Sequence, residues 1–267
     1  MRCLRGQAAL NRSAASRPFT YAVSSRPIRV SNVLRATPAY DLDPDNASIL
    51  VCGGGGVALH VTRQLKNMGS WVWQLQRSDD RRAEIEKMMA IVAKGDAMSK
   101  ADVQRVFDSI EEVDAVISTI GGTVANPVAD SEGNINLIEA AAKKGVKKFI
   151  LVTSIGCGET RDAPGENVYN VLKPILLEKE KAEKALQVNG DKMAFVIIRP
   201  GGLTDDTPSK AGVLTEDFSA CGAISRQDVA SLVVKALFSK KADGKILSAM
   251  DPARMMPGKA SPAVFLP

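Results

Sequence analysis

From residue 48 to residue 250, short apolar runs alternate with segments of helical periodicity. The expected strands include SILVC, DAVISTIGG, KKFILVTS and MAFVIIRP, and the expected helices include NINLIEAAAKKG and SRQDVASLVVKALF. A chain that alternates in this way forms a parallel sheet with helices on both faces. The near-continuous apolar runs of the later strands are typical of strands buried on both sides. We therefore predict an α/β fold, a Rossmann-like doubly wound parallel sheet in a single domain.

Four consecutive glycines lie in the sequence ILVCGGGGVALHV, residues 49–61. The amino end of a helix offers free N–H groups and partial positive charge, and small residues let the backbone approach a pyrophosphate. The register Gly53-x-Gly55-x-x-Ala58 matches the G-x-G-x-x-G/A fingerprint of dinucleotide sites. A strand before the glycines, a helix after them and a second strand about 20 residues further on support the match. We include Gly56 in the expected cofactor site.

The second strand ends in LQRSDDRR, which places Arg77 and Ser78 at its tip. NAD sites usually carry Asp or Glu here, whereas NADP sites accommodate the 2′-phosphate with Arg. An arginine fork pairs well with a phosphate group. Asp79 and Asp80 come later and are expected to open the next helix. The sequence therefore favours NADP(H), with NAD(H) as the weaker option; the alternative role of Arg77 is a solvated surface charge.

Across residues 48–250 the chain resembles the atypical short-chain dehydrogenase/reductase superfamily, in particular its NAD(P)H-binding branch with many plastid members. The segments that carry the resemblance are AKGD, VDAVISTIGG, SEGNINLIEAAAKKGVKKFILVTSIG, KEKAEKAL, FVIIRPGGL and GAISRQDVASLVVKAL. The resemblance implies cofactor contacts at Asp96, which would meet the adenine, at Gly121 behind the ribose and at Pro200 at the end of the sixth strand. Most members have G-x-x-G-x-x-G at the first turn, so the turn here is either substituted or one residue shorter.

Active members of that superfamily carry Tyr-x-x-x-Lys, in which the tyrosine passes a proton and the lysine lowers its pKa and holds the ribose. This chain contains Tyr169-x-x-x-Lys173, but Pro174 follows at once. Proline is favoured in the first turn of a helix and disfavoured inside one. We therefore expect Tyr169 and Lys173 to precede a helix that begins near residue 174.

Alignment of KAEKAL with the superfamily instead makes Lys179 the lysine of the Tyr-x-x-x-Lys motif, which would hold the ribose. The same alignment puts Ile175 at the tyrosine position. An isoleucine cannot transfer a proton. Three candidates for catalysis therefore remain: Lys179, Tyr169 on a mobile loop, and Ser154 after the fifth strand. Ser154 has a turn cap as its alternative role.

Residues 1–40 contain seven arginines and no lysine, aspartate or glutamate. Subtracting +7 from the formal charge of +5 leaves −2 on residues 41–267, which show no basic stripe, so nucleic-acid binding is not expected. An acid-free segment rich in Arg, Ser and Ala is typical of an organellar transit peptide. Its prolines favour the chloroplast over the mitochondrion, the alternative. We assign residues 1–40 to the transit peptide, 41–250 to an NAD(P)-binding Rossmann domain and 251–267 to a flexible tail.

His60 is the only histidine, and none of the four cysteines forms a CxxC pair, so we expect no metal site. The sequence has no apolar run of about 18 residues, so we expect no transmembrane segment.

The leading functional hypothesis is an NADP-preferring protein with weak or no catalysis, because the tyrosine is missing. It would serve as a plastid assembly factor, scaffold or redox-responsive subunit, with a membrane protein or photosynthetic complex as candidate partner. The alternative is an NADPH-dependent reductase of a small organic substrate. The expected substrate-facing segment, residues 203–224, is short, which argues against a large pocket. A third hypothesis is a nucleotide-sugar epimerase, and the short C-terminal part of the chain argues against it.

Overall fold

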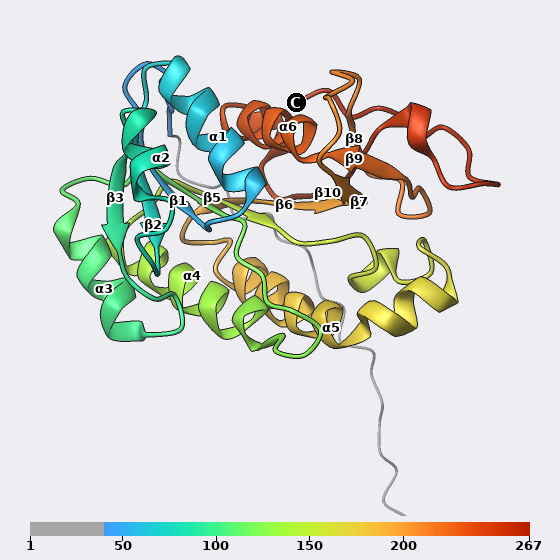
Figure 1. The fold of residues 1–267 in the computed structure, drawn as a ribbon, viewed down its shortest axis with the longest axis horizontal. Coiled ribbons are helices and arrows are strands. Elements are labelled where there is room, and N and C mark those ends of the chain that lie inside the picture. The colour runs from blue at the N-terminus through green and yellow to red at the C-terminus, as the bar shows by residue number, and fades with distance from the viewer. Residues whose placement is uncertain (1–39) are drawn as a thin grey trace, which may run out of the picture. The chain divides into compact units, whose positions relative to one another are not determined.

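The computed structural model describes residues 40–267, which form a sheet covered by helices on both faces (Figure 1). Neighbouring strands are parallel except at one edge, where β8 runs antiparallel to β10. In spatial order the eight strands are β3 (Ile91–Lys94), β2 (Trp71–Gln76), β1 (Ser48–Cys52), β4 (Ala115–Ser118), β5 (Lys148–Val152), β6 (Ala194–Pro200), β10 (Lys245–Met250) and β8 (Val213–Thr215). The order reverses between β1 and β4, which is where doubly wound folds bind their ligands.

Two layers of helices cover the sheet, as Figure 1 shows with α1 and α6 above and α3, α4 and α5 below. The six helices are α1 (Gly56–Asn67), α2 (Arg82–Lys87), α3 (Lys100–Ser109), α4 (Glu132–Lys144), α5 (Glu166–Val188) and α6 (Arg226–Leu237). Each layer has its own apolar core against the sheet. The predicted doubly wound α/β fold is therefore confirmed.

Shorter elements complete the described chain. Strand β7 (Gly202–Thr204) pairs with β9 (Ala223–Ser225). The single-turn 3-10 helices are η1 (Val128–Asp130), η2 (Gly158–Thr160), η3 (Lys240–Ala242) and η4 (Pro252–Arg254). Ser225 caps α6, because its hydroxyl accepts a hydrogen bond of 3.0 Å from the Asp228 N–H, as the spacing of these two residues predicts.

Helix α5 begins earlier than the sequence predicts. It starts at Glu166 and includes Tyr169, Lys173 and Pro174, so the expectation that this segment precedes the helix is wrong. An interior proline costs about 3 kcal/mol relative to alanine. Burial offsets this cost, because Tyr169 and Leu176 pack from the same helix into one apolar cluster, and a buried side chain of this size contributes about 1.5–3 kcal/mol.

Both ends of the described chain contact the sheet domain. Of the expected transit peptide, only Tyr40 lies within the described residues, and its hydroxyl donates a hydrogen bond of 2.7 Å to Asp243. Beyond η4, the Met256 N–H bonds the Cys221 carbonyl (2.9 Å) and the Phe265 N–H bonds the Leu214 carbonyl (2.7 Å). The segment predicted as a flexible tail is thus held at two points. Within residues 40–267, no helix has both the length and the apolar character needed to span a membrane.

Candidate functional site

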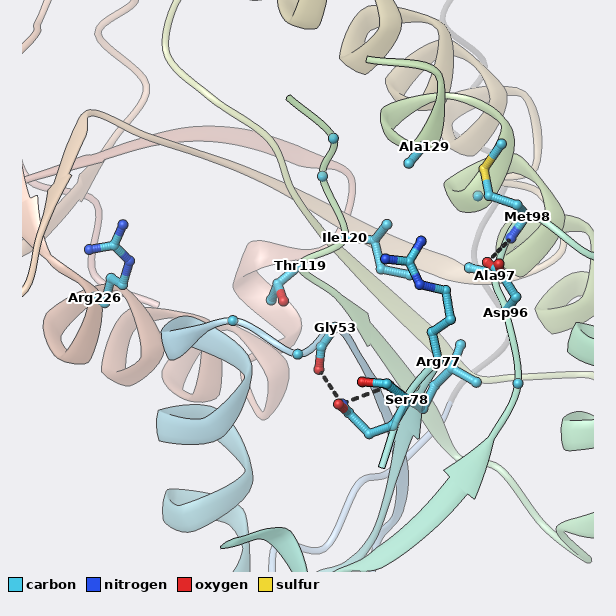
Figure 2. A pocket seen from close by; sticks show the side chains of 18 residues that line it. Gly53, Arg77, Ser78, Asp96, Ala97, Met98, Thr119, Ile120, Ala129 and Arg226 are labelled. Carbon is cyan, nitrogen blue, oxygen red and sulfur yellow. Dashed lines mark hydrogen bonds between the residues drawn. The ribbon is translucent and has the colours of Figure 1, made fainter. Parts of the chain in front are cut away.

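A cavity of about 600 Å³ opens at the carboxyl ends of β1, β2, β3 and β4, where the strand order reverses (Figure 2). Its walls are the glycine turn after β1, the tip of β2, the loop after β3 and the loop after β4. Its volume lies within the range of ordinary small-molecule sites.

The glycines of the first turn meet different neighbours. A Cβ on Gly53 would lie 2.4 Å from the Thr119 hydroxyl oxygen, and the φ of Gly53 is +135°, which L side chains rarely adopt. A Cβ on Gly56 would lie 2.9 Å from the Cδ atom of Arg226. Gly55, the N-cap of α1, has open space around it. Ala58 is fully buried beside Gly53, which allows close packing of α1 on β1. The turn can therefore bring backbone N–H groups against a phosphate.

Two glutamines of β2 hold this turn in place. Gln74 and Gln76 both donate a hydrogen bond from Nε2 to the Gly53 carbonyl, at 3.0 and 2.8 Å. Thr62 in α1 donates to Oε1 of Gln74 (2.9 Å). A carbonyl held by two amides fixes the peptide plane that follows it, so the backbone of the glycine turn is held in one orientation.

The tip of β2 carries a free positive charge. Arg77 and Ser78 are exposed and line the cavity, and Arg77 forms no ion pair within residues 40–267. The nearby carboxylate of Asp79 is instead occupied by Lys94 (2.5 Å) and Arg82 (3.0 Å). Hydrogen bonds with these two cations lower the pKa of Asp79 below its usual range, and the bond with Lys94 has the larger effect. An anion that reaches this tip therefore meets an unpaired guanidinium.

The loop after β3, the strand next to β2, forms another wall. Asp96 lines the cavity, and its Oδ1 accepts a hydrogen bond of 2.9 Å from the Met98 N–H. The Asp96 N–H donates to Asp102 (3.0 Å), which fixes the loop to α3. These bonds orient the Asp96 carboxylate at the cavity wall.

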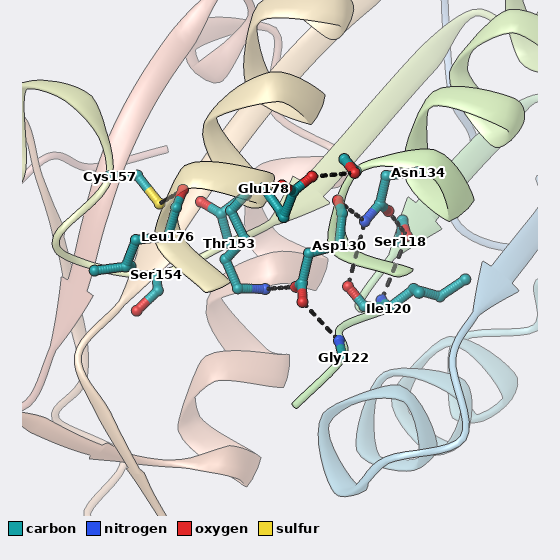
Figure 3. A network of polar contacts seen from close by, with 12 residues as sticks. Ser118, Ile120, Gly122, Asp130, Asn134, Thr153, Ser154, Cys157, Leu176 and Glu178 are labelled. Atoms are coloured by element: carbon teal, nitrogen blue, oxygen red, sulfur yellow. Dashed lines mark hydrogen bonds and ion pairs between the residues drawn. The ribbon is translucent and has the colours of Figure 1, made fainter. Parts of the chain in front are cut away.

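Lys179 lies close to Gly121, in the loop that follows β4. Figure 3 shows the Asp130 carboxylate at the Gly122 N–H in the same region. The Lys179 Nζ pairs with the fully buried carboxylate of Asp130 at 2.5 Å, and the Gly122 N–H donates to the same carboxylate at 2.6 Å. Gly121 leaves room for the pair, since its Cβ would lie 3.1 Å from Asp130 Oδ1 and 3.4 Å from Lys179 Nζ. The ammonium group is thus anchored through Asp130 to a wall of the cavity.

The other two catalytic candidates are occupied elsewhere. Tyr169 is buried against Cys157 and Leu176, and its ring lies under the Arg161 guanidinium at 4.5 Å. The Ser154 hydroxyl donates to the carbonyl of the next residue, Ile155, at 2.9 Å. No hydrogen bond between side chains joins Tyr169, Ser154 and Lys179 in the described part of the chain.

A comparison with known proteins identifies the family. The chain matches the NAD(P)H-binding family over residues 53–240. It belongs to that family. An uncharacterised chloroplastic protein of Arabidopsis thaliana is 33% identical over 164 residues, 55% of this chain and 58% of the relative. The photosystem II assembly factor Ycf39 of Synechocystis sp. is 29% identical over 147 residues, 53% of this chain and 44% of that protein.

Among solved structures, the anaerobilin reductase ChuY of Escherichia coli O157:H7 is similar, with a TM-score of 0.69 and 25% identity over 77% of this chain and 98% of that chain. The resemblance to the NAD(P)H-binding branch of the atypical short-chain dehydrogenases/reductases is confirmed. The chain spans less than two thirds of the length of the Arabidopsis and Synechocystis relatives.

The cavity fits the nucleotide cofactor of this family, because it combines an open glycine turn with an unpaired cation. Six residues singled out in the sequence line it: Gly53, Gly55, Arg77, Ser78, Asp96 and Gly121. Four others are not among its lining residues: Gly56, Ala58, Lys179 and Pro200. Pro200 ends β6, and its carbonyl accepts a hydrogen bond of 2.9 Å from the Ile155 N–H.

Several lining residues of this cavity were not singled out in the sequence, among them Gln76, Thr119 and Arg226. Gln76 directly precedes Arg77, so its position at the strand tip was visible, although no pattern marks a glutamine there. Arg226 is the first residue of α6, and only the fold brings it to the glycine turn. Within residues 40–267, no group of three or more His, Cys, Asp or Glu side chains could hold a metal ion.

Proposed function

We propose that this protein binds NADPH in preference to NADH and acts in the plastid as an assembly or scaffold protein that responds to its cofactor, with little or no dehydrogenase chemistry. The observation that carries the proposal is the contrast between a free Arg77 in the cavity wall and a proton-transfer position filled by Ile175.

The preference for NADPH is supported by the charges at the tip of β2. The 2′-phosphate of NADPH would meet the unpaired guanidinium of Arg77, whereas the Asp79 carboxylate that could repel it is held by Lys94 and Arg82. Hydrogen bonds between charged groups contribute about 1.5–3 kcal/mol. The Ser78 hydroxyl, beside Arg77, donates to the Asp80 carboxylate (2.7 Å) and would have to leave it to bond the same phosphate.

The weakness of catalysis is supported by the surroundings of Lys179. Ile175 lies one helical turn before Lys179, where the superfamily places its tyrosine, and an alkyl side chain has no proton to give. Tyr169 lies six residues before Ile175 on α5 and is buried in an apolar cluster. The lysine is neutralised by Asp130 rather than free to polarise a phenol.

The plastid and scaffold parts of the proposal rest on relatives. The Arabidopsis relative is named chloroplastic and the Synechocystis relative is named a photosystem II assembly factor. Together with the arginine-rich residues 1–40, they favour the plastid over the mitochondrion and a photosynthetic or membrane-protein complex as partner.

A fluorescence titration of the full chain with NADPH and with NADH tests the proposal. We expect saturable binding of both, with the lower Kd for NADPH, and slow NADPH oxidation without added substrate. Absence of binding by either nucleotide would contradict the whole proposal, and equal affinities would contradict the preference alone.

A second candidate function is reduction of a small organic substrate with hydride from NADPH. It is favoured by the similarity to ChuY, which is named an anaerobilin reductase, over 77% of this chain. Incubation of the chain with NADPH and anaerobilin distinguishes the two candidates. Substrate-dependent consumption of NADPH would support the reductase, and consumption at the substrate-free rate would support the scaffold.

A further inference from the structure

Arg226 reaches the cofactor cavity from α6, on the side of the glycine turn opposite Arg77 (Figure 2). Its side chain crosses the first residue of α1, since a Cβ on Gly56 would lie 2.9 Å from its Cδ. The fourth glycine of the run therefore leaves room for this arginine. Its guanidinium lies beside the helix end where a pyrophosphate binds in this fold.

In the described structure this guanidinium has an internal partner. Arg226 Nη1 pairs with Asp205 Oδ1 at 2.8 Å, and the exposed fractions of the two side chains are 30% and 84%. The carboxylate is thus almost fully in water, and Asp205 is not among the residues that line the cavity. It forms no other ion pair within residues 40–267.

We infer that Asp205 sets the affinity of the protein for the cofactor pyrophosphate by competing for Arg226. This inference rests on the proposed binding of NADPH. When the cofactor is absent, Arg226 pairs with Asp205; when the pyrophosphate occupies the glycine turn, Arg226 pairs with the pyrophosphate and Asp205 returns to solvent.

The energies of the two pairs favour this exchange. An ion pair as exposed as Arg226–Asp205 contributes about 0–1 kcal/mol, because water and salt screen it and two side chains lose freedom. An arginine–phosphate contact can be bidentate, and its hydrogen bonds are shorter and stronger than neutral ones. The exchange therefore proceeds towards the cofactor, but it lowers the net affinity by the strength of the pair that is broken.

The exchange also links the cavity to a surface loop. Asp205 directly follows β7, at the start of the loop that leads to β8. Further along, the N–H groups of Ser209 and Lys210 bond Asp228 at 3.0 and 3.1 Å, and Asp206 pairs with Arg254 at 2.6 Å. The Asp205 side chain pairs with a residue that lines the cavity, so cofactor binding would release this side chain and leave the neighbouring anchors of the loop in place.

The test compares two neighbouring carboxylates in the full chain. Asp205→Asn should lower the Kd for NADPH by about two- to fivefold, the fold-change that corresponds to an exposed pair. Asp206→Asn removes the same formal charge one residue away, from a pair with Arg254 rather than Arg226. We expect it to leave the Kd within error of the wild type. A gain in affinity is a result that loss of structure does not produce.

Adenosine 2′-monophosphate supplies the second measurement, because it carries the adenine and 2′-phosphate without the pyrophosphate. Its affinity should be the same in the wild type and in Asp205→Asn. Three outcomes would each overturn the inference while leaving NADPH binding intact. The first is a Kd for NADPH that is unchanged or higher in Asp205→Asn. The others are an equal gain in NADPH affinity in Asp206→Asn and an equal gain in affinity for adenosine 2′-monophosphate in Asp205→Asn. If the wild type binds no NADPH, the inference and the proposed function both fail.

Discussion

Two regions at the carboxyl edge of the sheet, called here its two halves, differ in what their polar groups do. In the half beside β1, β2 and β3, the glycine turn is open and Arg77 faces the cavity without an ion-pair partner among residues 40–267. In the half beside β5, β6 and α5, the charged groups are paired with one another, as Lys179 is with Asp130. The first half therefore has polar groups available to a ligand, whereas the charged groups of the second half are paired within the protein.

Arg199 in β6 is a further example of a buried charge in the second half that is paired within the protein. It is 1% exposed and binds Glu183 through Nη2 (2.7 Å) and Nε (3.1 Å) and Glu159 through Nη1 (3.0 Å). Thr153 donates to Glu183 as well (2.6 Å). Buried polar groups that satisfy each other in this way rigidify a region. The comparison supports the proposal that this chain keeps the cofactor site of its family while the polar groups of the second half serve its own structure.

The largest effect is expected from Lys179→Met, which tests whether the second half is structural. The variant leaves the Asp130 carboxylate, which is fully buried, without its ion-pair partner. Breaking a buried pair in this way costs about 3–5 kcal/mol. Urea denaturation should show a loss of that size in the free energy of unfolding.

The double variant Lys179→Met with Asp130→Asn is the control, because it removes the stranded charge. It should recover part of the lost stability. A loss below about 1 kcal/mol in Lys179→Met, the range of exposed pairs, would show that the pair is not structural.

Gly53→Ala tests the first half. The new Cβ would lie 2.4 Å from the Thr119 hydroxyl at a φ of +135°, so the turn must shift. Backbone strain of this kind costs about 1–3 kcal/mol, and the Kd for NADPH should rise by roughly 100-fold at the upper end of that range. The matched control is Gly202→Ala in β7, whose Cβ meets its nearest atom at 3.9 Å. Equal Kd values for the two variants would refute the role of Gly53 in binding.

Arg77→Asp should exchange the cofactor preference. A carboxylate at the tip of β2 repels a 2′-phosphate and can bond a ribose hydroxyl. The ratio of NADPH to NADH affinity should fall by roughly 10- to 100-fold. Arg81→Asp reverses a charge close by in the chain that is paired with Glu84 (3.1 Å) and should change the ratio little. If the ratio stays constant in Arg77→Asp, Arg77 is a solvated surface charge.

The smallest effect is expected from Tyr169→Phe. Phenylalanine keeps the ring that packs on Cys157 and Leu176 and lies under Arg161. The Kd for NADPH and the rate of NADPH oxidation should therefore stay within about twofold of the wild type, a difference of less than 1 kcal/mol. A fall of the oxidation rate by 10²-fold or more, typical of a lost general acid, would restore Tyr169 to a catalytic role.

The sequence predicted much of this fold because its periodicities are local. Alternating strands and helices specify the parallel sheet, and the glycine run between them specifies where its binding edge begins. The start of α5 was predicted wrongly, because a local rule for Pro174 was outweighed by the packing of Tyr169 and Leu176. Arg226 lies far from the glycines in sequence, and no local pattern could place it over Gly56.

The direct test of the separation between binding and chemistry is the distance from the Tyr169 hydroxyl oxygen to C4 of the nicotinamide in a crystal structure of the NADPH complex. We predict that the pyrophosphate lies on the turn from Gly53 to Gly55, and that this distance exceeds about 6 Å, too long for a hydrogen bond to a reacting atom. A Tyr169 hydroxyl within hydrogen-bond reach of a substrate atom at C4 would contradict the account.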